Sequence, residues 1–127
     1  MVKDLLIVSA GGALGAASRY LVVVSATRLL GLNFPYGTLI VNIVGSFAMG
    51  ALLELMALVW NTSMQTRLFL AVGFLGAFTT FSTFSLDVAF LYERKAYVLT
   101  AVYILASVVL SIGAFFAATW LIRRLFV

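Results

Sequence analysis

The chain has 127 residues, of which 65% are hydrophobic and 9% are charged, and its formal net charge is +4. Soluble domains have roughly 25% charged residues, so this composition excludes a soluble fold and predicts one all-α membrane domain, residues 1–127. The absence of cysteine excludes disulfides and thiolate metal sites, and the absence of histidine, with only four acidic residues, argues against acid–base enzymes.

Four hydrophobic runs are long enough to cross a bilayer as helices. The first runs from about Leu5 to Leu30, and because no polar mature region follows it, we expect a resident helix rather than a cleaved signal peptide. The other three predicted spans cover about residues 38–60, 66–92 and 97–122. The fold class is therefore an all-α protein with four transmembrane helices.

The first span contains a charge. Arg19 lies about 14 residues into it, and a rise of roughly 1.5 Å per residue puts it past the bilayer midplane. Such an arginine either snorkels to the far interface or supplies a fixed positive charge beside an anion path. Gly11 and Gly15 precede it with a spacing that permits close helix contact.

The second span contains one amide and one carboxylate. Asn42 lies deep in the span, where its amide either joins two helices or donates hydrogen bonds to a passing anion. Glu54 is nearer the end of the span, so we expect it to be exposed at the membrane interface.

The third span is interrupted near its middle by hydroxyl residues at 79, 80, 82 and 83. These hydroxyls either bond back to their own helix or mark a break whose freed backbone groups face a cavity, an interface or an ion. Because Gly73 and Gly76 flank the cluster, we expect the third helix to be broken mid-membrane. The i, i+3 spacing of Phe78, Phe81 and Phe84 predicts one aromatic stripe.

The fourth span also contains polar residues, and their spacing places them on one helix face. Tyr103, Ser107 and Ser111 are spaced i, i+4, i+8 and predict a narrow polar track, which serves either helix–helix contact or a lined pathway. The deep groups of the chain are mainly donors, and phenylalanine ring edges also carry partial positive charge. Such a set favours a small anion as the solute.

The basic residues lie mostly at span ends, as membrane anchors do, which argues against nucleic acid as a partner. The side shared by the two termini and the second loop has four, namely Lys3, Arg67, Arg123 and Arg124. The opposite side has three, namely Arg28, Arg94 and Lys95. This near balance means either that one charge decides the orientation or that the chain inserts both ways and pairs as an antiparallel (dual-topology) homodimer.

Three segments resemble the Fluc (CrcB) family of fluoride channels: Gly-Gly-Ala-Leu-Gly-Ala-Ala-Ser-Arg at 11–19, Gly-Thr-Leu-Ile-Val-Asn-Ile-Val-Gly at 37–45, and Gly-Phe-Leu-Gly-Ala-Phe-Thr-Thr-Phe-Ser-Thr-Phe-Ser at 73–85. They occur in the family's order, and the resemblance covers nearly the whole chain. It implies passive export of the fluoride ion across the cell inner (plasma) membrane by an antiparallel homodimer with two pores.

The resemblance also implies roles for single residues. Phe81 and Phe84 would edge the fluoride, and Asn42 would be the pore amide. The backbone carbonyls of Gly76 and Thr79 would hold a structural Na⁺ at the dimer centre, although many family members have a glycine where this chain has Ala77. The remaining pathway residues implied are Arg19, Thr38, Ser82, Thr83, Tyr103, Ser107 and Ser111.

Two other functions are compatible with a chain of this size. A small multidrug-resistance-type proton-coupled exporter also has four short helices, but it depends on a membrane-embedded glutamate in its first helix, which this chain lacks. An accessory membrane subunit without transport would leave the donors on three helices unexplained.

Overall fold

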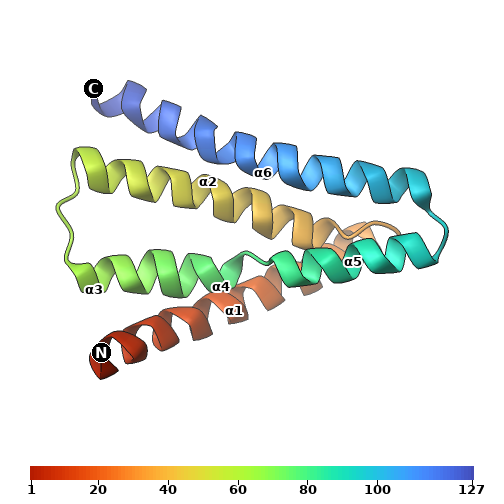
Figure 1. The fold of residues 1–127 in the computed structure, drawn as a ribbon, viewed down its shortest axis with the longest axis horizontal. Coiled ribbons are helices and arrows are strands. Elements are labelled where there is room, and N and C mark those ends of the chain that lie inside the picture. Colours follow the sequence, from red (N-terminus) through yellow and green to blue (C-terminus); the bar gives the residue numbers. More distant parts are fainter.

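The structure is a computed structural model that describes residues 1–127, and it is entirely helical (Figure 1). Four of its segments are long and apolar enough to cross a membrane. Their elements are α1 (Val2–Leu30), α2 (Tyr36–Leu58), the third span made of α3 (Met64–Arg67), η1 (Leu68–Leu75), α4 (Gly76–Phe78) and α5 (Phe81–Glu93), and α6 (Tyr97–Phe126). The four predicted spans are confirmed, and their ends differ from the predicted ones by at most four residues.

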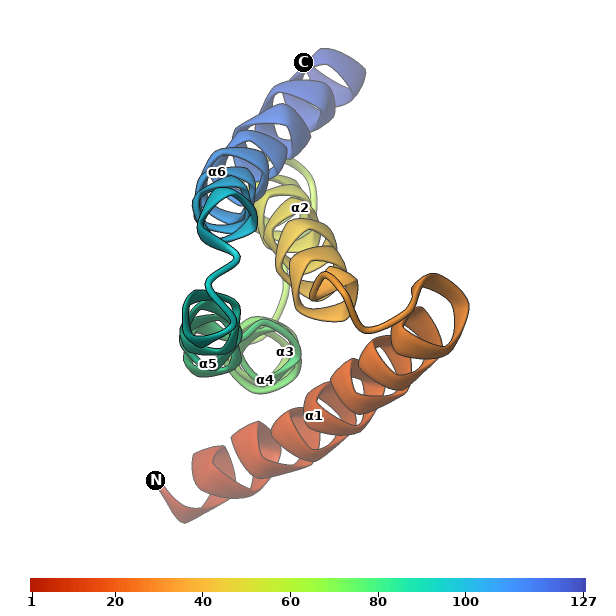
Figure 2. The same ribbon diagram turned by 90° about the vertical axis from the view of Figure 1, so that its right-hand side faces the viewer.

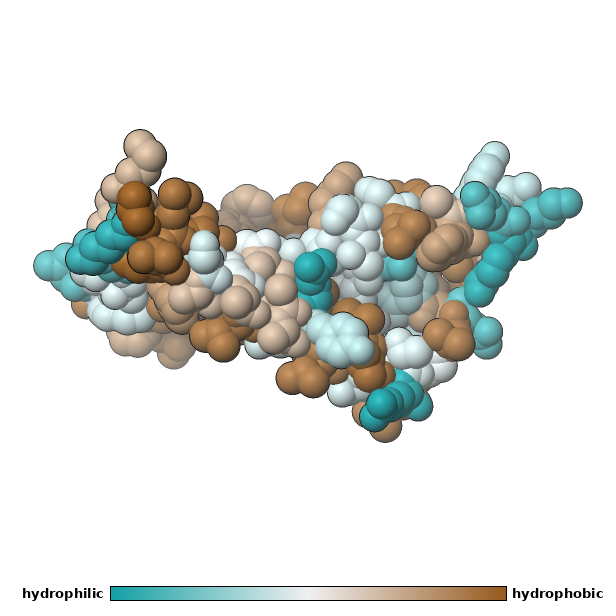
Figure 3. Space-filling model, turned by 90° about the horizontal axis from the view of Figure 1, so that it is seen from below, coloured by the Kyte–Doolittle hydropathy of each residue, from teal (hydrophilic) through white to brown (hydrophobic).

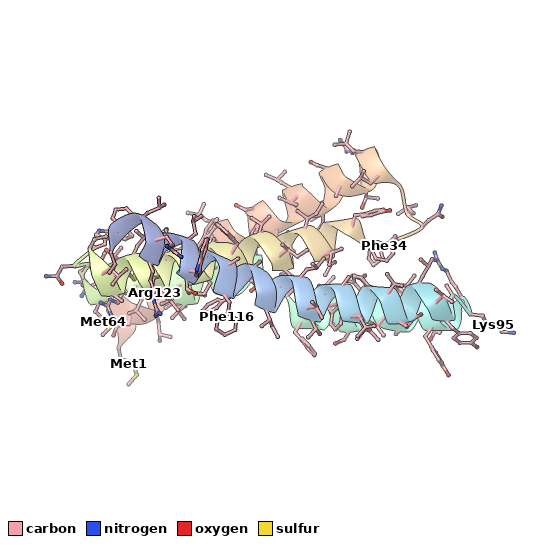
Figure 4. The ribbon with its side chains drawn as sticks, turned by 90° about the horizontal axis from the view of Figure 1, so that it is seen from above. Met1, Phe34, Met64, Lys95, Phe116 and Arg123 are labelled. Atoms are coloured by element: carbon pink, nitrogen blue, oxygen red, sulfur yellow. The ribbon has the colours of Figure 1, made fainter.

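The spans run up and down through one elongated molecule. Figure 4 places Met1, Met64 and Arg123 at one end and Phe34 and Lys95 toward the other. Seen end-on in Figure 2, α2 and α6 lie side by side, while α1 crosses obliquely beside the third span. The two termini and the turn before α3 therefore share a side, as the charge comparison assumed.

Most side chains face outward. Only 20 of the 127 residues are buried, and the exposed ones include many large hydrophobic side chains. Figure 3 shows hydrophobic residues over much of the surface, with hydrophilic ones gathered mainly toward the ends. In water this surface would be unstable, so the chain is a multi-pass membrane protein whose outer faces meet lipid or another protein.

Glycines allow α1 to cross the third span at close range. A Cβ at Gly15 would overlap the carbonyl of Phe74, and a Cβ at Gly11 would overlap the carbonyl of Phe69. From the other side, a Cβ at Gly73 would lie 2.8 Å from the carbonyl oxygen of Val8. The small-residue spacing in the first span thus brings two backbones into direct contact, where van der Waals packing drives helix association.

The third span contains two irregularities. Most of its first part, η1, is a π-helix, in which backbone hydrogen bonds join residues five apart rather than the four of an α-helix. After α4 the chain then leaves the helix: Thr79 (φ −83°, ψ 157°) and Thr80 (φ −152°, ψ 124°) are both extended. Figure 2 shows α5 displaced sideways from α4. The predicted break is confirmed, whereas the π-helix was not predicted.

The predicted aromatic stripe is wrong. Phe78 belongs to α4, is buried, and stacks on Phe74 with ring centroids 6.0 Å apart. Phe81 begins α5 on the far side of the break and lies 76% exposed. The i, i+3 argument required a continuous helix, and the two extended residues turn the second part away from the first.

The expected exposure of Glu54 is also wrong. Its side chain is buried, and its Oε1 lies 2.6 Å from Nε of Arg123. Because α6 continues past the predicted end of the fourth span, it brings this arginine alongside the end of α2. The pair joins α2 to α6 near the end of the molecule that holds both termini.

The crossing of α1 with the third span can be tested by Gly15→Ala. The added methyl meets the Phe74 carbonyl, so the two helices must separate, and we expect a loss of about 1–3 kcal/mol in the free energy of unfolding. Gly12→Ala is the matched control, because its Cβ would meet nothing closer than 3.9 Å. Thermal unfolding in detergent measures both, and a Gly15→Ala protein as stable as the control would contradict the close crossing.

Candidate functional site

Asn42 joins α2 to the break in the third span. Its Nδ2 donates to the carbonyl oxygen of Thr80 at 3.0 Å, and the Thr80 backbone N–H donates to its Oδ1 at 2.8 Å. A Cβ at Gly45, one turn further along α2, would overlap the Thr79 methyl group, so glycine is what lets the extended strand lie this close. The Asn42 amide therefore joins α2 to the third span, as one of its two predicted roles required, and its second N–H remains free for another acceptor.

The break frees several carbonyl oxygens, among them those of Gly76 and Thr79. In a continuous α-helix the N–H of Thr80 would bond to the carbonyl of Gly76, and that of Thr83 to the carbonyl of Thr79. Here the first N–H bonds to Asn42, and the second bonds to the Thr80 hydroxyl at 3.1 Å. The carbonyls of Gly76 and Thr79 consequently accept no hydrogen bond.

An inner cavity of about 310 Å³ lies beside the break, between α2, α5 and α6. The residues that line it include Asn42, Ser46, Thr79, Thr80, Phe81, Phe84, Ser107 and Ser111. The hydroxyl oxygens of Ser107 and Ser111 are buried and have no hydrogen-bond partner. Buried hydroxyls without partners are uncommon, so the natural partner for this pair is a guest in the cavity.

Three aromatic rings continue from the inner cavity into the protein. Phe81 and Phe84 have ring centroids 5.4 Å apart, and Phe84 and Tyr103 have centroids 5.2 Å apart. Phe84 is buried and Tyr103 fully so, whereas Phe81 is 76% exposed. The Tyr103 hydroxyl donates to Oδ2 of Asp87 at 2.9 Å, which fixes the ring.

An outer cavity of about 420 Å³ lies on the other side of these rings, near the connector between α1 and α2. Its lining includes Thr27, Phe34, Thr38, Thr83, Asp87 and Arg94. Arg19 reaches it from α1, since its Nη1 lies 3.5 Å from Oγ1 of Thr83. This contact directs the Arg19 side chain toward the third span, and whether it serves an anion path stays a prediction.

The site residues predicted from the sequence therefore form two groups about one aromatic wall. Lining the inner cavity are Asn42, Phe81, Phe84, Ser107 and Ser111. Thr38 and Thr83 line the outer cavity, Arg19 contacts Thr83, and Tyr103 packs between Phe84 of the inner lining and Phe34 of the outer lining. Two others lie apart. Ser82 is exposed, with its hydroxyl 3.3 Å from that of Thr80, and Gly76 is exposed beside the break.

Sequence reasoning missed Ser46 and Asp87. Ser46 follows Asn42 by one helical turn, and Asp87 follows Phe84 by three residues, so both share a helix face with a predicted site residue. That spacing was the available signal for both.

Comparison with known proteins identifies the family. The model for the family described as "CrcB-like protein, Camphor Resistance (CrcB)" matches residues 6–119. This chain belongs to the CrcB family. The match includes the break and every residue of both cavity groups, so the geometry above is that of a CrcB protein.

Several CrcB relatives are similar over nearly their full length. The "Fluoride-specific ion channel FluC" of Agrobacterium fabrum is 57% identical over 123 residues, which cover 97% of this chain and 98% of the relative. The protein of the same name from Rhodospirillum centenum is 52% identical, and the alignment covers 96% of this chain and 97% of the relative. That from Caulobacter vibrioides is 50% identical, and the alignment covers 98% of this chain and 99% of the relative.

The junction between α2 and the break generates a prediction for Asn42→Ala. The variant leaves the Thr80 N–H and C=O without partners, which costs about 1–3 kcal/mol for each buried group. We expect faster amide hydrogen exchange at residues 79–83 than in the parent. Ser46→Ala is the control, because it also lines the inner cavity but makes no bond to the break. Unchanged exchange in Asn42→Ala would show that the break holds without this amide.

Proposed function

We propose that this chain is a passive, fluoride-specific ion channel. The observation that carries the proposal is the inner cavity, where two buried hydroxyls lack partners, two phenylalanine rings are close, and no acidic residue is part of the lining. Donors without acids suit an anion. Relatives of the same length and at 50–57% identity bear the name fluoride-specific ion channel.

The pathway follows from the two cavities. Fluoride would enter the outer cavity, pass the wall formed by Tyr103 and Phe84, and reach the inner cavity, or travel in the reverse direction. As it loses water, the Ser107 and Ser111 hydroxyls and the positive ring edges of the phenylalanines replace part of the hydration shell. Ser107 and Phe84 are buried, so they need little rearrangement when the ion arrives.

Passive flow is sufficient for export. Fluoride enters cells as the neutral acid from acidic surroundings and ionises in the cytoplasm, where the charged form is trapped. The inside-negative potential of the cell inner membrane then drives the anion outward through any selective path, at about 2.3 kcal/mol per elementary charge per 100 mV. No phosphate-binding loop for energy coupling occurs in the sequence.

The working unit is an antiparallel homodimer with two pores. Phe81 belongs to the aromatic group yet is 76% exposed, so a second copy is a natural cover for its outer face. The near balance of basic residues between the two sides of the membrane supports insertion in both orientations, which an antiparallel dimer requires.

A structural Na⁺ fits the break. The carbonyls of Gly76 and Thr79 accept no hydrogen bonds within the chain, and hard cations prefer oxygen ligands. Two such carbonyls from each of two copies would supply four ligands at the dimer centre. Ala77 does not exclude this, because a backbone ligand does not depend on the side chain next to it.

The proton-coupled exporter is not favoured. The only acidic residue of α1 is Asp4, which lies in the first turn and pairs with the N-terminal amine at 3.5 Å rather than lying deep in the membrane. The relatives' names likewise indicate transport of an ion rather than enzymatic catalysis.

The channel function is tested by flux from liposomes. We expect purified protein to pass fluoride down its gradient and largely to exclude chloride. We also expect Phe81→Ile and Phe84→Ile to lower the fluoride flux at least about tenfold. Each variant removes a ring edge whose interaction with the passing anion is worth roughly 1.4 kcal/mol or more. Phe116→Ile is the control, because this exposed ring on α6 lines neither cavity. Fluoride flux equal to that of empty liposomes would sink the proposal.

Dual topology is tested by single cysteines, because the chain has none of its own. With one cysteine added at either terminus, we expect an impermeant thiol reagent to label about half of the protein from each side of the membrane. Labelling from one side alone would contradict the antiparallel dimer while leaving fluoride conduction intact.

A further inference from the structure

Arg94 lies at the mouth of the outer cavity, where α5 ends. Its Nη2 donates to the backbone carbonyl of Asn33 at 3.0 Å, so the side chain reaches from the end of α5 to the connector between α1 and α2. An arginine has five N–H donors in a rigid fork, and this contact uses only one nitrogen. The guanidinium is thus fixed at the opening with donors left for an anion.

Three polar or charged residues of the outer cavity form a row along α5 and its C-terminal cap. Thr83, Asp87 and Arg94 follow each other at spacings of four and seven residues, which places them on one face of that helix. Arg19 contacts the Thr83 hydroxyl at the inner end of the row, and Arg94 lies at the outer end. Asp87 lies between the two cations and accepts the Tyr103 hydroxyl.

Asp87 is unfavourable for an incoming anion. It and Arg94 are the only charged residues that line the cavity, and Arg19 lies beyond Thr83 at the inner end, so without Arg94 an entering anion would meet the carboxylate first. With Arg94 in place, an anion meets a cation first and a lining whose two charges cancel. A fixed charge at the mouth of a low-dielectric cleft raises the local concentration of its counter-ion.

We propose that Arg94 draws fluoride into the outer cavity and offsets the repulsion by Asp87, so that it sets the rate at which the ion reaches the aromatic wall. This role rests on the proposed channel function and adds to it a residue outside the helix break and outside the polar track. The residue acts through its charge, and its bond to Asn33 keeps that charge at the opening.

The test is fluoride flux at two ionic strengths. The Debye length is about 30 Å at 0.01 M and about 3 Å at 1 M salt, so an electrostatic effect disappears as salt increases. Arg94→Gln should lower flux about threefold at low ionic strength and by much less at high ionic strength, with fluoride held constant and sulfate as the added anion. Arg94→Lys keeps the charge and should stay close to the parent at both.

Arg28→Gln is the matched control. Arg28 is exposed in the last turn of α1, near the same connector, but it does not line the outer cavity. This variant removes the same charge from the same end of the molecule, and we expect a smaller change than for Arg94→Gln.

Three outcomes would overturn the proposal. Equal flux in Arg94→Gln and the parent at low salt, with the parent conducting, would overturn the role of Arg94 while leaving the channel function in place. An equal loss in the Gln and Lys variants at every ionic strength would assign Arg94 a structural role instead. A parent protein without fluoride flux would overturn the channel function, and this inference with it.

Discussion

Two hydrogen bonds between Asn42 and the backbone of Thr80 are the constraint on which the rest of the site depends. The bilayer core has no water to satisfy a broken helix, and each backbone group left unpaired there costs several kcal/mol. One amide side chain supplies both the donor and the acceptor that Thr80 needs. The Thr80 hydroxyl supplies another acceptor, for the N–H of Thr83. The third span is therefore broken in the membrane while the N–H groups of Thr79, Thr80 and Thr83 keep hydrogen-bond acceptors.

The same bonds decide what the break exposes. By taking the N–H groups of Thr80 and Thr83, they leave the carbonyls of Gly76 and Thr79 without partners, and these are the two oxygens proposed to hold Na⁺. The change of direction also separates Phe78, which packs inside with Phe74, from Phe81, which faces outward beside the inner cavity. The proposed ion site and the separation of the aromatic rings thus depend on the same departure from helical geometry.

Lipid made much of this fold predictable. A bilayer admits only helices and closed barrels, so the four long apolar runs predicted four helices, and a cluster of hydroxyls after two glycines predicted the break. Spacing arguments failed where they assumed a continuous helix, as with the aromatic stripe. Pairings across helices had no sequence signal: Glu54 with Arg123 depends on how far α6 extends, and Tyr103 with Asp87 depends on how α5 meets α6. Most polar and aromatic residues of the inner cavity could be named in advance, but Ser46, Asp87 and the division between two cavities could not.

The unpaired hydroxyls of Ser107 and Ser111 favour an anion channel over an accessory subunit. Each buried group without a partner lowers stability by about 1–3 kcal/mol, and alanine at either position would remove that cost. In a protein with only a scaffolding role, nothing would compensate for this loss of stability. An anion in the inner cavity would accept from both hydroxyls beside the rings of Phe81 and Phe84, so binding would recover the lost hydrogen bonds. A cation in the same place would find no carboxylate in the lining, so the cavity would discriminate by the sign of charge before it discriminates by size.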